Sequence, residues 1–166
     1  MFERPLYRTR QFLGALKPHI AAVERAEAAE LLGETLWPLF ESMTDRDQRH
    51  SLDVYRILKE QGRRDEHLLM AALLHDAGKG RLAGVSVRLW HRVAYVLLST
   101  GAPAALRRLA NGPGGLGALH GHADRGAVVA EALGAPVAVV ELIRRHEEHG
   151  SSDERLRLLR AADDAC

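Results

Sequence analysis

Cysteine is almost absent from this chain of 166 residues, and the single one, Cys166, stands at the last position. One thiol cannot form a disulfide framework, nor a zinc site built from several thiolates. Long apolar runs are missing too, since none reaches the roughly 18 residues that a membrane-spanning helix needs. The first residues also lack the apolar core of a signal peptide. We therefore expect a cytoplasmic protein with no membrane partner.

A surplus of charge of either sign is also absent. Lys and Arg together number 23 and Asp and Glu 22, which gives a net charge of +1. This balance speaks against nucleic acid as the main partner. Apolar residues make up 46% of the chain and aromatic residues only 5%. The composition is that of a globular protein, and the length fits one structural domain.

Apolar residues recur at helical spacing along most of the chain, whereas the alternation typical of strands is scarce. Thr44 and Asp65 stand where N-caps are expected, and Gly62 stands where a helix should end. We therefore predict an all-α bundle of about seven to eight helices. Those that matter below are expected over residues 20–32, 36–43, 66–77, 85–99 and 136–147.

The predicted helix over residues 66–77 is apolar on every side and should lie at the centre of the bundle. His75 and Asp76 stand near its end, followed by Ala77, Gly78 and Lys79. An Asp is rarely buried unless it is paired or bound to a metal ion. A cation beside the helix end would offset the desolvation of Asp76 and keep His75 neutral. The pattern therefore indicates a metal site at this helix end.

The stretch 111–117, AsnGlyProGlyGlyLeuGly, is the clearest loop in the sequence. It comes shortly before His120 and His122. We expect this loop to border the pocket and its motion to gate the entry of substrate.

Further His and Asp residues follow one another in an ordered series around the His75–Asp76 motif. They are His50 in HisSerLeuAspValTyr, His122 in HisAlaAspArgGlyAla, His146 in HisGluGluHisGly and Asp163 in AlaAlaAspAsp. The series resembles that of the HD-domain family of metal-dependent phosphohydrolases over roughly residues 44 to 166. The resemblance implies an all-α HD-domain bundle, which agrees with the helical periodicity. We expect an HD domain over residues 44–166 and N-terminal helices over 1–43 that pack on it.

The resemblance implies a centre for one or two divalent metal ions. In the family pattern the ligands of the first metal would be His50, His75, Asp76 and Asp163, and Asp76 would bridge to a second metal held by His122 and His146. Ligands of this chemistry, without thiolate, suit Fe, Mn, Zn, Ni, Co or Mg. A bound metal lowers the pKa of water and supplies hydroxide at neutral pH. The implied activity is hydrolysis of a small phosphate ester, above all a nucleotide, by attack of that hydroxide.

Two ligand assignments have a close competitor in the sequence. We favour His122 over His120, because Gly126–Ala127 then follow at the family's offset. We favour Asp163 over its neighbour Asp164, because Asp163 directly follows two alanines.

Other residues are candidates for contact with the substrate. Lys79 could meet a phosphate group as a point charge, or it could simply complement the dipole at its helix end. We expect Asp76 and Lys79 to act in catalysis. Substrate binding is predicted for Lys79, Arg81, His120 and His149.

Two other functions compete with this one. The first is a catalytically silent HD module that binds metal or senses nucleotides. The second is a symmetrical dinucleoside polyphosphate hydrolase, although the His-Thr-x-Gly segment of that subfamily appears here as HisGluGluHisGly. The expected partner in either enzymatic case is a small phosphate ester or nucleotide, and homodimer formation stays open.

Overall fold

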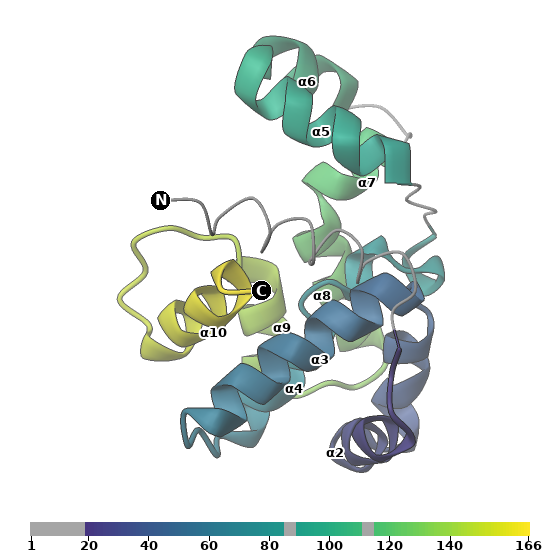
Figure 1. The fold of residues 1–166 in the computed structure, drawn as a ribbon, viewed down its shortest axis with the longest axis vertical. Coiled ribbons are helices and arrows are strands. Elements are labelled where there is room, and N and C mark those ends of the chain that lie inside the picture. The colour runs from purple at the N-terminus through teal and green to yellow at the C-terminus, as the bar shows by residue number, and fades with distance from the viewer. Residues whose placement is uncertain (1–18, 85–88, 111–114) are drawn as a thin grey trace, which may run out of the picture.

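The computed structural model describes residues 19–84, 89–110 and 115–166. Regular structure in these residues is helical, with no strand among them, and this confirms the predicted all-α class (Figure 1). No helix in these ranges combines the length and apolar character needed to cross a membrane. The α-helices are α2 (Ala22–Glu41), α3 (Asp45–Glu60), α4 (Glu66–Leu74), α5 (Leu89–Gly101), α6 (Pro103–Ala110), α7 (Gly115–His120), α8 (His122–Ala132), α9 (Val137–Arg145) and α10 (Glu154–Asp164).

Helix α2 consists of two pieces that meet at Gly33. Gly33 has φ 62° and ψ 178°, a backbone conformation that L side chains rarely adopt. The break separates the two helices that the sequence predicts over 20–32 and 36–43. Both pieces bury apolar side chains in the core that they share with the rest of the bundle. A boundary between a 1–43 unit and a 44–166 domain stays a prediction, and residues 1–18 lie outside the described ranges.

Helices α3 and α4 begin at the residues that the sequence predicts as caps. The side chain of Thr44 accepts a hydrogen bond from the backbone N–H of Asp47 at 3.3 Å, and Asp65 accepts one from Leu68 at 3.1 Å. Helix α4 is buried along most of its length, as its apolar sequence predicts. It is nevertheless shorter than expected. It ends at Leu74, and two 3₁₀ turns follow, η1 (Ala77–Lys79) and η2 (Arg81–Ala83).

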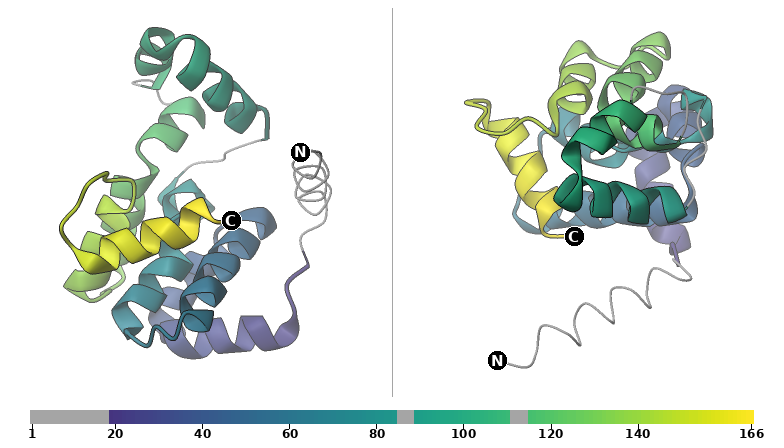
Figure 2. Two further views of the ribbon diagram at one scale, coloured as in Figure 1. Left: turned by 60° about the vertical axis from the view of Figure 1, so that its left-hand side comes forward. Right: turned by 90° about the horizontal axis from the view of Figure 1, so that it is seen from above.

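Helices α5 and α6 form a hairpin that projects from the bundle, and α7 leads back from it to α8 (Figures 1 and 2). The predicted helix over 85–99 corresponds to α5, with residues 85–88 outside the described ranges. The predicted loop over 111–117 needs a correction. Residues 111–114 lie outside the described ranges, but 115–117 begin α7. Packing overrides the low helix propensity of the glycines there, because Leu119 is buried and α7 contacts both α5 and α6.

The turn after α4 lies directly against the first turns of α8. A Cβ atom on Gly78 would lie 1.8 Å from the carbonyl oxygen of His122, and one on Gly126 would lie 2.9 Å from the backbone nitrogen of Gly78. The two backbones therefore approach more closely than any side chain allows. This contact explains why α4 ends early, since the chain must turn out of the helix to bring Gly78 against α8.

We predict that Gly78→Ala lowers the free energy of unfolding by about 3 kcal/mol, the upper part of the range for overpacking. The added methyl group would force the turn away from α8. Urea unfolding followed by circular dichroism measures the change. Gly101→Ala is the matched control, because its Cβ would meet nothing within 4 Å. Equal stability of the two variants would contradict the close approach.

An ion pair joins α2 to α3 beside the core. Both guanidinium nitrogens of Arg49 lie on the carboxylate of Glu24, at 2.7 and 2.8 Å. Arg49 also contacts Asp53 at 3.0 Å. The hydrogen bonds from Arg49 lower the pKa of Glu24 from 4.5 to about 2. Folding therefore favours the ionised form of Glu24.

We predict that Glu24→Gln costs about 1 kcal/mol of stability at pH 7. Because the folded pKa of Glu24 lies below its unfolded value, its contribution is complete above pH 4.5 and is lost as the pH falls toward 2. The difference between wild type and variant should therefore shrink over this window. Urea unfolding at several pH values tests this, with Glu30→Gln on the exposed face of α2 as the control. A constant difference between pH 7 and pH 3 would refute the assignment.

Candidate metal centre

Six of the predicted site residues converge from five helices. His50 lies within α3, His75 and Asp76 follow the end of α4, and His122 begins α8. His146 follows the end of α9, and Asp163 lies near the end of α10. Two groups have their potential ligand atoms within 4.8 Å of one another, namely His50, His75 and Asp76, and Asp76, His122 and His146. Asp76 belongs to both groups.

Three of the histidines are oriented by the same local contact. The Nδ1 atoms of His75, His122 and His146 lie 2.9, 2.7 and 2.7 Å from the carbonyl oxygens of Ala72, Leu119 and Ile143, each three residues earlier. A carbonyl oxygen only accepts, so each Nδ1 must carry the proton. In a neutral ring this leaves the lone pair on Nε2. A histidine prepared in this way is a typical metal ligand.

With Nδ1 protonated in each ring, none of these Nε2 lone pairs meets a hydrogen-bond donor among the described residues. Nε2 of His75 is buried and has no hydrogen-bond partner. Nε2 of His122 and Nε2 of His146 face each other at 3.1 Å. Two lone pairs at this distance repel unless a proton or a cation lies near both. This donor set therefore fits a metal ion, which would satisfy all three nitrogens.

Asp76 is the charge at the middle of the cluster and is only 4% exposed. Its Oδ1 lies 2.6 Å from Nζ of Lys79, 3.3 Å from Nε2 of His122 and 3.7 Å from Nε2 of His75. Burial alone would raise the pKa of Asp76, but the positive charges of Lys79 and His75 outweigh it and hold the pKa well below its ordinary range. The carboxylate is therefore ionised at neutral pH and available to a cation.

The charges of the centre also shift the histidines, in opposite directions. Burial lowers the pKa of His146 to about 3, with His75 and His122 acting in the same direction. Burial acts the same way on His75, but the carboxylates of Asp76 and Asp163 outweigh it and raise its pKa. His146 is therefore neutral at pH 7, as metal ligation requires.

One end of the cluster is buried and the other is open to solvent. His122 and His146 are each 4% exposed. The side chains of His50 and Asp163 are about 30% exposed, and Nε2 of His50 lies 2.8 Å from Oδ1 of Asp163. Burial would raise the pKa of Asp163, but the hydrogen bond from His50 and the nearby imidazole of His75, 3.6 Å from Oδ1, hold it far below its usual range. A substrate can therefore approach most directly past His50 and Asp163.

The C-terminal ends of two helices add to the preference for a cation. His75 and His146 directly follow the C-terminal residues of α4 and α9. The C-terminus of a helix carries a partial negative charge from its unpaired carbonyl groups. Two such ends at one point, together with Asp76 and Asp163, make the centre a site for positive charge.

The structure separates the two pairs of competing residues. His120 ends α7 and is exposed, whereas His122 is buried in the cluster. Asp164 is exposed and pairs with Arg160 at 3.5 Å, whereas Asp163 contacts His50.

The residues predicted to bind the substrate differ in how closely they approach the cluster. Lys79 reaches the cluster through Asp76, and its side chain is 14% exposed. Arg81 is exposed on η2, next to the cluster in sequence. His149 is exposed in the turn after α9, where its Nε2 contacts the guanidinium group of Arg160.

Sequence reasoning missed Arg160. Its Nη1 donates to the carbonyl oxygen of Glu147 at 2.9 Å, and its Nη2 contacts His149. Arg160 therefore ties the turn that follows His146 to the helix that carries Asp163. No motif marks this residue, because the contact depends on how α9 and α10 pack.

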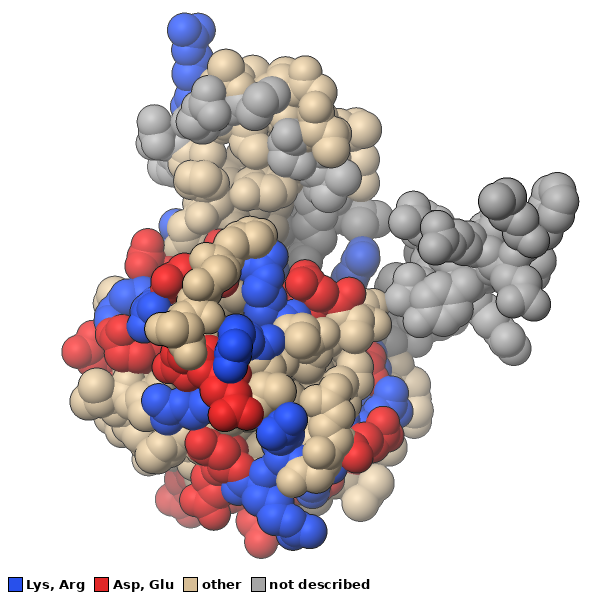
Figure 3. All heavy atoms as spheres, turned by 90° about the vertical axis from the view of Figure 1, so that its left-hand side faces the viewer, with Lys and Arg blue, Asp and Glu red and all other residues tan. Residues whose placement is uncertain are grey.

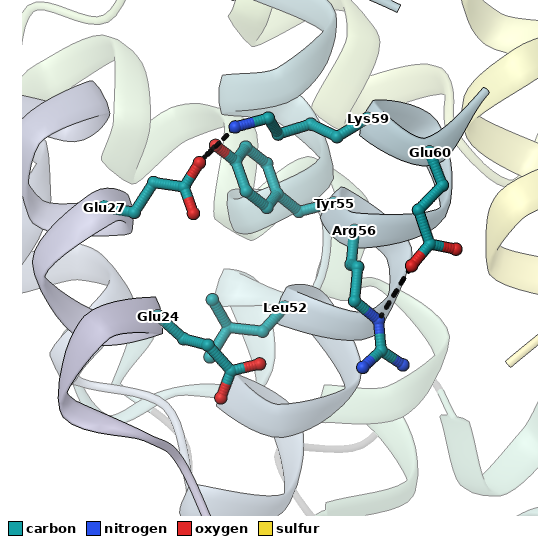
Figure 4. Close-up of a pocket in the computed structure, with 7 residues that line it drawn as sticks. All are labelled: Glu24, Glu27, Leu52, Tyr55, Arg56, Lys59 and Glu60. Carbon is teal, nitrogen blue, oxygen red and sulfur yellow. Dashed lines mark hydrogen bonds and ion pairs between the residues drawn. The ribbon is translucent and has the colours of Figure 1, made fainter. Parts of the chain in front are cut away.

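A separate hollow of about 170 Å³ lies between α2 and α3 (Figure 4). Glu27 accepts hydrogen bonds there from Tyr55 and Lys59, and Arg56 pairs with Glu60. The residues of α3 that line it are on the opposite face of the helix from His50. With its charges paired in this way, the hollow offers no comparable centre for a metal ion.

Comparison with known proteins agrees with this geometry. The model of the HD domain matches residues 48–165, which is most of the chain. The chain belongs to the HD-domain family. No curated protein and no solved structure gives a match. Membership places the chain in a superfamily of metal-dependent hydrolases, whose domains bind divalent metal ions.

We predict that chelator-treated protein gains thermal stability when Mn²⁺ or Zn²⁺ is added, because an ion that binds only the folded state stabilises it. At a hundredfold excess over Kd the gain is about 2.7 kcal/mol. His50→Ala should reduce both the rise in melting temperature and the metal content per chain. Scanning calorimetry and elemental analysis measure the two. His67→Ala, an exposed histidine on α4, is the control and should behave as wild type. The same metal content in both variants would exclude His50 as a ligand.

Proposed function

We propose that this HD-domain protein is a metal-dependent phosphohydrolase that acts on a small phosphate ester, with nucleotides as the first class to test. The observation that carries the proposal is the shared position of Asp76 in two groups of potential ligands. One carboxylate between two such groups is the arrangement that a pair of metal ions needs. Family membership supports the same reaction class.

His50, His75, Asp76 and Asp163 would hold one ion, and Asp76, His122 and His146 the other. Divalent ions bound there supply a nucleophile at neutral pH and Lewis-acid stabilisation of the phosphoryl group. The donor set contains nitrogen and carboxylate oxygen without sulfur, which suits several first-row metals and Mg.

Side chains near the centre would bind the phosphate ester. Lys79 lies on Asp76 and carries the positive charge closest to the cluster, so it is the first candidate to bind a phosphate oxygen. Arg81 follows it on the exposed side. The exposure of His50 and Asp163 leaves room for the ester at that end of the centre.

A silent metal-binding or nucleotide-sensing module is the second candidate. Some HD proteins are not catalytic. The ammonium of Lys79, 2.6 Å from Asp76, already neutralises the carboxylate that the reaction would use. A silent module would bind nucleotide in the presence of metal and leave it intact.

We predict that protein purified without chelator and without a histidine tag hydrolyses at least one member of a panel of mononucleotides, nucleoside triphosphates and diadenosine tetraphosphate. Asp163→Asn should lower kcat/KM at least about 10³-fold, which corresponds to about 4 kcal/mol of transition-state stabilisation. Asp164→Asn changes the neighbouring acid on the same helix and should leave turnover within about twofold of wild type. Phosphate release and product chromatography measure the rates.

Intact ligands with full metal occupancy but no turnover on this panel would favour the silent module. Turnover of diadenosine tetraphosphate well above that of mononucleotides would favour the symmetrical dinucleoside polyphosphate hydrolase. Equal loss of activity in the two Asp variants would count against Asp163 as a ligand.

A further inference from the structure

His122 is oriented across a joint between two helices, unlike the two other histidines of the cluster that make the same local contact. The carbonyl oxygens that orient His75 and His146 lie within α4 and α9, the helices that these residues directly follow. His122 begins α8, but the carbonyl oxygen 2.7 Å from its Nδ1 is that of Leu119, which belongs to α7. The orientation of the His122 ring therefore depends on how α7 and α8 are joined.

The joint between α7 and α8 is a single residue, Gly121, which has no side chain to cap the start of α8. Its backbone N–H donates to the carbonyl oxygen of Gly117 at 3.1 Å, and its carbonyl oxygen accepts from the N–H of Arg125 at 3.2 Å. A helix start usually gains stability from a side chain that accepts from its unpaired N–H groups. The start of α8 therefore lacks the stabilisation that a capping side chain would provide.

The side chain of Arg125 spans this joint from α8. Its Nη2 donates to the carbonyl oxygen of Gly117 at 3.0 Å, the same oxygen that accepts from the N–H of Gly121. The guanidinium group also lies against Gly121, where an added Cβ would be 3.1 Å from Nη1 and 3.6 Å from Cζ. One side chain therefore holds the last turn of α7, which carries Leu119, to the first turn of α8, which carries His122.

Resting on the proposed function, we infer that Arg125 is a positioning residue that sets the affinity of the centre for one of its two ions. This second ion is the one that Asp76, His122 and His146 would hold. While Arg125 fixes the joint, the carbonyl oxygen of Leu119 stays on Nδ1 of His122, and Nε2 stays 3.3 Å from Oδ1 of Asp76. Without Arg125 the two helices are free to shift at the joint, and the ring loses the contact that orients it.

The first ion should depend little on Arg125. Apart from the shared Asp76, its ligands lie on α3, at the end of α4 and on α10, namely His50, His75 and Asp163. Charge alone would act in the opposite direction, because removing a positive side chain near a cation site favours the cation. A neutral variant that binds the second ion more weakly would therefore report lost positioning rather than lost charge.

The test measures binding of Mn²⁺ to the metal-free chain by calorimetry, with electron paramagnetic resonance to separate free Mn²⁺ from bound, magnetically coupled pairs. His122→Ala identifies which binding event belongs to the second ion. We expect Arg125→Gln to weaken binding of the second ion about tenfold, at the lower end of the effects of changes behind a metal ligand, and binding of the first less than about twofold. Arg125→Lys keeps one donor for Gly117 and should recover part of the lost affinity.

Arg157→Gln is the matched control, because Arg157 is an exposed arginine on α10, the helix that carries Asp163. The face of the bundle that carries α10 mixes acidic and basic side chains (Figure 3). Loss of one exposed charge there should change the affinity for either ion by less than about twofold. Urea unfolding of the metal-free variants, followed by circular dichroism, shows that each one is folded. If Arg125→Gln does not fold, Arg125→Lys takes its place, and unchanged binding of the second ion would then overturn the inference.

Unchanged binding of the second ion in folded Arg125→Gln, or equal weakening of both ions, would overturn the inference. Binding of a single Mn²⁺ by the wild type would overturn it as well. Hydrolysis of phosphate esters together with any of these results would leave the proposed hydrolase standing. Selective weakening of the second ion, without hydrolysis of any phosphate ester by the wild type, would uphold the role of Arg125 and overturn the hydrolase.

Discussion

The buried carboxylate of Asp76 needs positive charge around it, and the surroundings of the centre meet that need. A carboxylate removed from water in an apolar bundle is strongly destabilising unless charges and hydrogen bonds replace its hydration. Lys79 and His122 lie within 3.3 Å of its Oδ1, and His75 lies slightly further away. The imidazole groups come from different helices, so compensating Asp76 also requires those helices to meet. The ionised state of Asp76 and the packing of the helices around it therefore depend on each other.

Two contacts besides those of the ligand side chains bring the helices together at this point. Gly78 and Gly126 allow the turn after α4 to touch the first turns of α8, which brings Asp76 and His122 together. On the other side, Arg160 joins the turn after His146 to α10. Neither contact involves the side chain of a potential metal ligand, yet both limit how far the ligand-bearing helix ends can move. This is the rigid support that a preorganised metal centre requires.

Much of this could be predicted from the sequence, wherever the cause is local. Thr44 and Asp65 cap their helices because a cap needs only a side chain and a backbone N–H a few residues ahead. The order of His and Asp residues indicated the family because each motif is local too. The end of α4 could not be predicted, since it depends on Gly126, far away in the sequence. The contact of Arg160 with the turn after α9 depends on tertiary packing in the same way.

Lys79 connects the compensation of Asp76 to the proposed recognition of phosphate. Its ammonium lies 2.6 Å from Oδ1, the same oxygen that Nε2 of His122 approaches at 3.3 Å. A divalent cation and this ammonium cannot both lie so close to one oxygen without strong repulsion. A cation bound to Oδ1 would therefore displace the ammonium of Lys79 from that oxygen. Because η1 holds the backbone of Lys79 beside Asp76, the displaced ammonium would stay at the edge of the centre, where we propose that a phosphate group replaces the carboxylate as its partner. Under the proposed function, metal binding and affinity for an anionic substrate would be coupled through this one side chain.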